Sequence, residues 1–234
     1  MKNLKKLPQL TVFALSFICI LMALSSCVKS STNNDVPPAK VMVVNTVSGS
    51  ASQYLELNGN KVNTTAVAYG QTSGYLSALP GTYNGQFINS TSATVNTSFS
   101  VTLQPSTYYT IYYTGNDTVK SSFVAQDMVN APSGSQAAVQ FINFSTAIKS
   151  AIDISVTGGN KVITNLADGL ASTYYAVSAN SAFTLSATGS STTLFSIPAL
   201  GLQNGNAYTI YITGSTLATI SYHLVSHTAA NSDL

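Results

Sequence analysis

The sequence contains no arginine and no tryptophan, and only 7% of its 234 residues are charged, against roughly 25% in an average globular protein. A nucleic-acid site needs clustered cationic side chains, and no such cluster is present, which argues against DNA or RNA as a ligand. Disorder needs low hydrophobicity and high net charge, whereas this chain is 45% hydrophobic with a formal charge of +2. Its surface must therefore be solvated by hydroxyl and amide groups, as in many secreted β-proteins.

Cysteine is also scarce: Cys19 and Cys27 are the only two. Cys19 lies in the apolar run from Leu10 to Leu24, which follows a basic start containing three of the nine lysines. That run is shorter than the roughly 20 residues of a membrane-spanning helix and fits a secretory signal peptide. If the signal peptide is removed, Cys27 has no partner for a disulfide, and six lysines remain against seven carboxylates.

The residues Leu24-Ser25-Ser26-Cys27 resemble the lipobox of bacterial lipoproteins. The resemblance implies cleavage before Cys27, which would then carry a thioether-linked diacylglycerol and an N-acyl chain such as palmitate. Several acyl chains, at about 0.8 kcal/mol per buried methylene, hold a protein on a membrane permanently. An ordinary signal peptide or an uncleaved membrane anchor are the alternatives. We expect a cell-envelope protein anchored to the outer membrane, with the periplasmic or surface face left open because only Asp35 follows the cysteine closely.

One stretch of the mature chain occurs twice. Tyr108–Gly115 reads YYTIYYTG, and residues 207–214 read AYTIYITG. Both alternate strictly and end in Thr-Gly, as a half-buried strand does where it meets a turn. Because a single apolar strand needs a sheet around it, the repeat predicts two similar sheet domains in tandem.

The sequence around these two stretches also repeats in the same order. Each repeat contains about seven or eight short predicted strands, with a turn signal roughly every ten residues. No apolar stripe with helical spacing is present in the mature chain, so we expect almost no helix there. The predicted fold is all-β, with two tandem immunoglobulin-like antiparallel sandwiches. The predicted organisation is a signal peptide at 1–26, a lipidated cysteine and flexible tether at 27–38, a first sandwich at 39–128, a linker at 129–136, a second sandwich at 137–227 and a flexible tail at 228–234.

The repeat resembles the bacterial family called domain of unknown function 4397. Matching motifs are the openings Val41–Asn45 and Val139–Asn143, the segment from Gly74 through Tyr83, and both Tyr-Thr-Ile-Tyr strands. The resemblance covers nearly all of residues 39–226 and implies fold and location, but no chemistry. Tyr54 stands where the family has a hairpin Asp, which argues against a ligand-binding role for that Asp in both repeats.

No catalytic or metal-binding set can be assembled from the sequence. The carboxylates are scattered singly; Asp153 and Asp168 could approach each other across a hairpin, although turn or edge-strand roles are expected. His223 and His227 are the only histidines, and four residues along a strand would place them about 13 Å apart, too far for one ion. The Gly-x-Ser-x-Gly setting of a nucleophilic serine is missing. We therefore predict no enzyme activity, no metal and no cofactor.

The tyrosines are the candidate ligand contacts. Rows of exposed aromatic side chains can stack on sugars or peptides, although tyrosine is also favoured in strands for packing alone. The candidates are Tyr108, Tyr112 and Tyr211 on the threonine-bearing face of the repeated strands, and the pair Tyr174 and Tyr175. Separately, Asp117-Thr118-Val119 resembles a bacterial O-glycosylation acceptor, with Thr118 as the modified residue.

The predicted function is that of a lipid-anchored envelope protein whose two sandwiches serve non-enzymatic binding, adhesion or scaffolding, with a glycan or a protein as the ligand. One alternative is a pilus subunit that assembles by strand exchange, although the related pilins mature at an arginine and this chain has none. The other is a secreted glycosidase or peptidase.

The lipid anchor is directly testable. Replacing Cys27 with Ser removes the thiol that would accept the diacylglycerol, so the variant should move from the membrane fraction to the soluble fraction. Immunoblotting of fractionated cells measures this, with Ser26→Ala as the control that keeps a small residue before the cysteine. Retention of Cys27→Ser in membranes would contradict lipidation.

Overall fold

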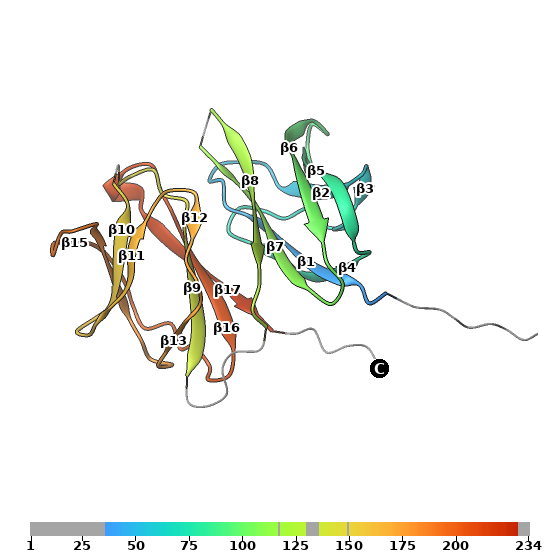
Figure 1. The fold of residues 1–234 in the computed structure, drawn as a ribbon. Helices are drawn as coiled ribbons and strands as arrows, with labels where there is room; N and C mark the ends of the chain where they lie inside the picture. The colour runs from blue at the N-terminus through green and yellow to red at the C-terminus, as the bar shows by residue number, and fades with distance from the viewer. Residues whose placement is uncertain (1–35, 117, 130–135, 149, 229–234) are drawn as a thin grey trace, which may run out of the picture. The chain divides into compact units, whose positions relative to one another are not determined.

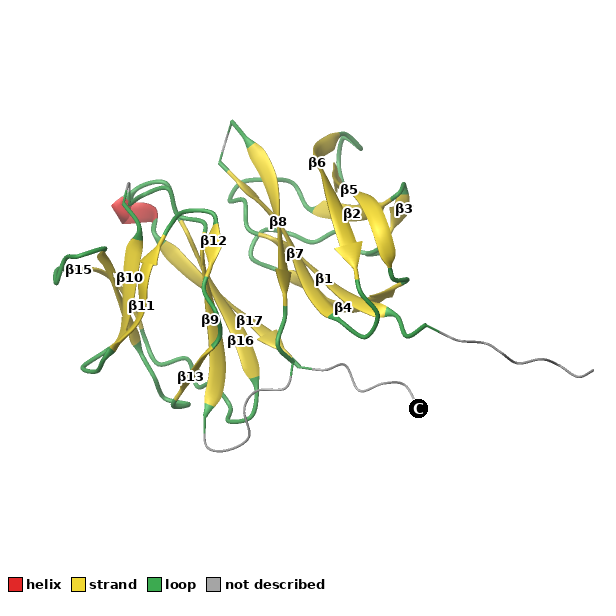
Figure 2. Ribbon diagram, viewed as in Figure 1, coloured by secondary structure: helices red, strands yellow, loops and turns green. Residues whose placement is uncertain are grey.

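The structure is a computed structural model that describes residues 36–116, 118–129, 136–148 and 150–228 (Figure 1). Strands dominate this part of the chain, and its one helical element is η1 (Leu217–Thr219), a single 3-10 turn (Figure 2). The near-absence of helix predicted for the mature chain is thus confirmed for these residues. None of them forms a helix long and apolar enough to cross a membrane. The signal peptide, Cys27 and linker residues 130–135 lie outside the described residues.

Within the described residues, the first sandwich contains eight strands in two sheets. One sheet has the order β4-β1-β7-β8 and the other the order β3-β2-β5-β6. Their bounds are β1 (Ala39–Asn45), β2 (Gln53–Leu57), β3 (Asn60–Lys61), β4 (Thr72–Ala78), β5 (Gly81–Asn89), β6 (Val95–Leu103), β7 (Tyr108–Gly115) and β8 (Lys120–Gln126).

The second sandwich repeats this plan. Its sheets have the orders β12-β9-β16-β17, with β13 also paired to β9, and β11-β10-β14-β15. The bounds are β9 (Ala137–Asn143), β10 (Ile152–Val156), β11 (Lys161–Leu166), β12 (Leu170–Ala171), β13 (Tyr175–Val177), β14 (Phe183–Ala187), β15 (Thr193–Ile197), β16 (Ala207–Thr213) and β17 (Ser221–His227).

These sheets confirm the prediction of an all-β chain with two sandwich-like halves. One detail differs from the prediction of antiparallel pairing throughout, because β1 pairs with β7, and β9 with β16, in parallel. The repeated Tyr-Thr strand therefore lies in the middle of its sheet, between a parallel and an antiparallel neighbour. Nearly all residues of β7 and β16 are buried, so both faces of the repeated strand are covered, and strands covered on both faces are strongly apolar.

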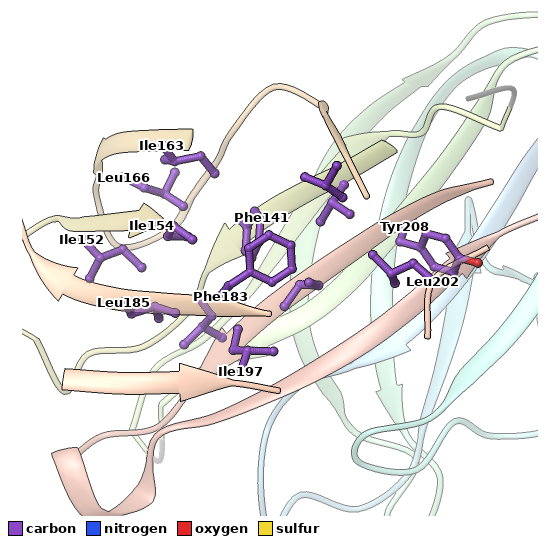
Figure 3. Close-up of a cluster of buried hydrophobic side chains, with 14 of the residues drawn as sticks. Phe141, Ile152, Ile154, Ile163, Leu166, Phe183, Leu185, Ile197, Leu202 and Tyr208 are labelled. Atoms are coloured by element: carbon purple, nitrogen blue, oxygen red, sulfur yellow. The ribbon is translucent and has the colours of Figure 1, made fainter. Parts of the chain in front are cut away.

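Each sandwich has its own hydrophobic core between its two sheets. In the first, Phe87 packs against Tyr113 with ring centroids 5.2 Å apart. In the second, Phe141 of β9 and Phe183 of β14 pack edge to face with ring centroids 5.1 Å apart. Figure 3 labels both residues within this cluster. The inward face of the repeated strand fills both cores, with Tyr109, Ile111 and Tyr113 in one and Tyr208, Ile210 and Ile212 in the other.

A third buried cluster joins the two sandwiches. It consists of Met42, Val44, Tyr112, Ala125, Ile142, Tyr211 and Val225, which come from the β4-β1-β7-β8 sheet on one side and the β9-β16-β17 strands on the other. We call this set the inter-sandwich contact. Both sandwiches accordingly belong to one compact unit.

The core of the second sandwich gives a stability prediction. Phe183 is completely buried, so Phe183→Ala should lower the free energy of unfolding by about 3–5 kcal/mol, because the ring leaves a cavity that close-packed neighbours fill only in part. Urea unfolding followed by circular dichroism measures this. Leu217→Ala, at a side chain that is 58% exposed, is the control and should change stability by less than about 0.5 kcal/mol. Equal effects of the two substitutions would contradict this description of the core.

Candidate functional site

The threonine-bearing face of the repeated strands lies in the inter-sandwich contact and is not open to solvent. Tyr112 and Tyr211 are 0% and 1% exposed, and their rings meet edge to face with centroids 5.9 Å apart. The prediction that these two tyrosines contact a ligand is therefore wrong. The strand is apolar on its second face because another sandwich covers it, and one sequence pattern cannot distinguish that cover from a ligand.

Equivalent residues of the two sandwiches meet across this contact. Strand pairing shows the equivalence: Tyr112 lies opposite Phe123 in its sheet, and Tyr211 lies opposite His223. Likewise Ala125 lies opposite Thr110, and Val225 lies opposite Thr209. A surface that meets its own counterpart is typical of isologous dimer interfaces. Here the two copies are joined in one chain.

A buried polar cluster lies where β7 and β16 begin. Asp127, directly after β8, accepts hydrogen bonds at Oδ2 from the hydroxyls of Tyr75 and Thr110, both at 2.7 Å. His227, at the end of β17, lies 2.8 Å from the Tyr75 hydroxyl through Nδ1 and 2.8 Å from the Thr209 hydroxyl through Nε2. Since Asp127 and Thr110 belong to the first sandwich and His227 and Thr209 to the second, Tyr75 connects the two halves.

Burial determines the charge state of this cluster. It raises the pKa of the Asp127 carboxyl to about 6, although the hydrogen bonds from Thr110 and Tyr75 act in the opposite direction. It lowers the pKa of His227 to about 4. Between these values both side chains are neutral, because an apolar contact penalises either charge.

The order of Thr209, His227 and Asp127 resembles a nucleophile, a base and an acid. The hydroxyl of Thr209 and the ring of His227 are both 0% exposed, so no substrate can reach them while the sandwiches are in contact. A catalytic base must lie within hydrogen-bonding reach of the substrate. The cluster is therefore a structural connection in this arrangement.

The other titratable candidates are separated. His223 stacks on Tyr211 with ring centroids 4.8 Å apart and faces the Tyr69 hydroxyl at 3.3 Å. Across the described ranges, no three His, Cys, Asp or Glu side chains gather to hold a metal. The side chain of Asp153 is buried and holds local structure: it pairs with Lys161, which lowers its pKa to about 2, and it accepts bonds from the Asn165 and Gly189 amides.

The expected turn or edge role of Asp153 is therefore wrong, because β10 lies between β11 and β14. Asp168 has a different position, in the turn before β12. Asp168 is exposed, but neighbouring atoms remove part of the water around its carboxyl, and this partial desolvation raises the pKa of that group. No ion pair or hydrogen bond between described residues joins these two carboxylates.

An open cleft lies at the opposite end of β7 and β16 from the polar cluster. Its volume is about 500 Å³. Both sandwiches contribute walls: the ends of β7 and β16, the starts of β8 and β17, the loops after β1 and β9, and the turns at Tyr69 and Asp168. The lining combines hydroxyls (Thr46, Ser48, Thr114, Ser121, Ser122, Thr146, Thr213, Ser215, Thr219 and Ser221) with the aromatic rings of Tyr69, Phe123 and Phe144 and the carboxylate of Asp168.

Two equivalent glycines shape the cleft. Gly115 and Gly214 end the repeated motif with φ of +117° and +123°, in a region that L-residues with side chains avoid. A Cβ on them would lie 2.2 Å from the Val119 carbonyl oxygen and 2.6 Å from that of Thr219. The Thr-Gly ending read as a turn signal in the sequence thus lets the chain fold closely back into β8 and β17.

The remaining sequence candidates lie elsewhere. Tyr108 is half-buried and packs edge to face on Tyr75 at 4.9 Å, and the Tyr174 hydroxyl accepts a bond from the Met128 amide. Tyr175 pairs with Val139 and packs on the core of the second sandwich. None of the three lines the cleft. Thr118 is exposed in the β7–β8 turn, where its hydroxyl donates to Asn116 Oδ1 at 2.9 Å, whereas Asp117 and Cys27 lie outside the described residues.

The residues that sequence reasoning missed are the cleft hydroxyls and the pair Asp127 and His227. A signal for the pair exists in the repeat, because the two residues hold equivalent positions opposite the start of the repeated strand, Asp127 directly after β8 and His227 as the last residue of β17. No signal in a single sequence places Thr46, Ser48 and Thr146 around one cleft, since their proximity depends on how the two sandwiches pack.

Three comparisons relate the chain to known proteins. A family model described as "Domain of unknown function (DUF4397)" matches residues 39–155, half of the chain. Comparison with curated proteins finds no match. Among solved structures, the chain is similar to CBMbc (family CBM26) from Eubacterium rectale Amy13K, in complex with maltoheptaose, at 11% identity, a TM-score of 0.27, and coverage of 82% of this chain and 98% of that one. At this TM-score the likeness carries no argument about function.

The connection through Tyr75 can be measured. Tyr75→Phe removes the hydroxyl shared by Asp127 and His227 and leaves a buried carboxyl with one donor fewer, so it should destabilise the protein by about 1–3 kcal/mol. Chemical unfolding at pH 7 reports the change. Tyr108→Phe removes a hydroxyl from the tyrosine that packs against Tyr75, and this matched control should leave the free energy of unfolding nearly unchanged. If Tyr75→Phe proves as harmless as the control, the polar cluster does not stabilise the contact.

Proposed function

Since the chain belongs to the DUF4397 family, whose description gives no activity, we propose its function from the cleft: it is a non-enzymatic binding protein of the cell envelope that holds an oligosaccharide between its two sandwiches. The lining of the cleft carries the proposal. Ligand sites typically measure about 300–1,000 Å³ and combine apolar walls with a few placed polar groups, and this cleft, at about 500 Å³, falls in that range.

The chemistry of the lining suits a sugar. A sugar ring has hydroxyls around its rim and C–H groups on its faces, so it needs both hydrogen-bonding groups and flat apolar surfaces. The hydroxyl-bearing walls supply the first, and the rings of Tyr69, Phe123 and Phe144 supply the second. Asp168 is the only charged side chain among the described lining residues, and its carboxylate can accept from two neighbouring sugar hydroxyls.

The geometry favours binding over catalysis. Glycoside hydrolysis needs two carboxyl groups about 5–9.5 Å apart on either side of the bond, and the described lining offers Asp168 alone. The histidine nearest to the cleft, His223, is stacked on Tyr211 and faces Tyr69. A ligand would be held here without an evident route to bond cleavage.

We further propose that a lipid on Cys27 and the following residues through position 38 attach this binding unit to the outer membrane. The Leu24-Ser25-Ser26-Cys27 motif and the lack of a second cysteine in the mature chain support this part of the proposal. A lipid-held protein with a saccharide site would capture or organise glycans at the surface to which it is anchored. Thr118, exposed beside the cleft wall formed by Asn116 and Val119, stays the proposed O-glycosylation acceptor.

The test is a glycan array followed by titration calorimetry of the best binder with the purified full chain. Thr146 is exposed and lines the cleft, so Thr146→Trp should fill the space and weaken binding at least tenfold. Thr164→Trp makes the same change at an exposed position of β11 that does not line the cleft, and should bind like the wild type. Binding to peptides and to no glycan, or equal affinity of both variants, would contradict the proposal.

A further inference from the structure

The inter-sandwich contact contains a buried carboxyl, which burial favours in its protonated form, and a buried imidazole, which burial favours in its deprotonated form. The side chains of Asp127 and His227 are both 0% exposed, and Asp127 Oδ2 lies 3.8 Å from His227 Nδ1. They occupy equivalent positions, one at the end of each sandwich's last strand, and each is bound to the equivalent threonine, Thr110 or Thr209. No part of the proposed binding function uses them.

The groups around the pair are neutral. Tyr75 comes from β4, Tyr112 from β7 and Tyr174 from the segment before β13, and burial raises the pKa of all three phenols. Gln140 of β9 accepts a bond from the Thr209 hydroxyl at 3.3 Å. Among the described residues, His227 is the only cationic group that pairs with Asp127. If Asp127 is ionised or His227 is protonated, the only described group that can compensate the charge is therefore the other member of the pair.

The proton balance follows from these surroundings. When the groups are exposed, between about pH 4 and 6.5, the carboxyl is ionised and the imidazole protonated, so the pair holds one proton. In the closed contact at about pH 5 the carboxyl holds the proton and the imidazole is neutral, so the pair again holds one. In this state the protonated carboxyl donates to the Tyr75 hydroxyl, which donates to Nδ1 of the neutral ring, whereas Tyr75 donates to Oδ2 when the carboxyl is ionised. Closing the contact moves a proton from the His227 ring to the Asp127 carboxylate, through Tyr75 or solvent, with no net uptake or release.

We propose that Asp127 and His227 are a compensating pair, so that their joint contribution to the contact between the two sandwiches stays the same from about pH 4 to 6.5. Stability depends on pH only where the closed and open states bind different numbers of protons. The pair removes that difference, although each member alone would create one. Because both walls of the cleft depend on the contact, the pair would also keep the cleft assembled in mildly acidic surroundings.

Breaking the pair should produce two pH dependences of opposite sign. With Asp127→Asn, His227 alone titrates: its pKa is lower in the folded state than in the unfolded state, so stability is lost as pH falls from about 6.5 to 4. With His227→Asn, Asp127 alone titrates: its pKa is higher in the folded state, so stability is gained as pH falls from about 6 to 3.8. One proton changes the unfolding equilibrium constant by at most about tenfold per pH unit.

The experiment is urea unfolding of the full chain and both variants at several pH values between 4 and 7.5. Slopes are compared with the wild type, so that other groups, such as His223, cancel. Glu56→Gln makes the carboxyl-to-amide change on β2, outside the contact, and should reproduce the wild-type slope. Asp153 does not interfere, because its contribution is lost only below about pH 3.8.

Opposite deviations of the two variants from the wild type support the pair. Wild-type slopes in both variants, or deviations of the same sign, would overturn it. A second measurement covers the case in which a variant does not fold: in the wild type, nuclear magnetic resonance should show the His227 ring neutral down to about pH 4. A His227 that titrates near pH 6.5 in the folded wild type would overturn the proposal without any variant.

Discussion

The repeated strand is buried on both of its faces, and the other features of the molecule depend on this. In β7, Tyr109, Ile111 and Tyr113 face the core of the first sandwich, whereas Thr110 and Tyr112 face the second sandwich. In β16, correspondingly, Tyr208, Ile210 and Ile212 face the core of the second sandwich, whereas Tyr211 faces the first sandwich. A strand with apolar cover on both sides is held firmly, because each side contributes buried area at roughly 25 cal/mol per Å².

This double burial explains both the polar cluster and the cleft. Threonine and tyrosine can cover an apolar surface and still hydrogen-bond, so the contact tolerates Asp127 and His227 where a purely aliphatic contact would not. At the other end of the strands, Gly115 and Gly214 turn the chain back, and the sheets no longer cover each other. The cleft is thus the place where an isologous contact ends.

The low charge of the chain affects both the inter-sandwich contact and the cleft. With few ionic groups on the surface, association of the sandwiches rests on packing and hydrogen bonds, which salt screens little. It also leaves the buried pair without competing charges, so that a single proton can be shared between two groups. The same scarcity gives the cleft a hydroxyl-rich lining in which Asp168 is the one charged side chain among the described residues, the feature on which the saccharide proposal rests.

The sequence by itself determined the all-β class, the duplication, the inward face of the repeated strand and the turns at its end, because alternation and glycine act over a few residues. It also supplied the candidate lipid anchor at Cys27, which the described residues do not include. The tertiary structure alone decided that Tyr112 and Tyr211 pack on each other, that Asp153 is buried in a central strand, and that Asp127 meets His227. The pattern of an apolar face indicates only that some surface covers it. Which surface covers it depends on contacts between residues about a hundred positions apart, and a local pattern carries no information about such contacts.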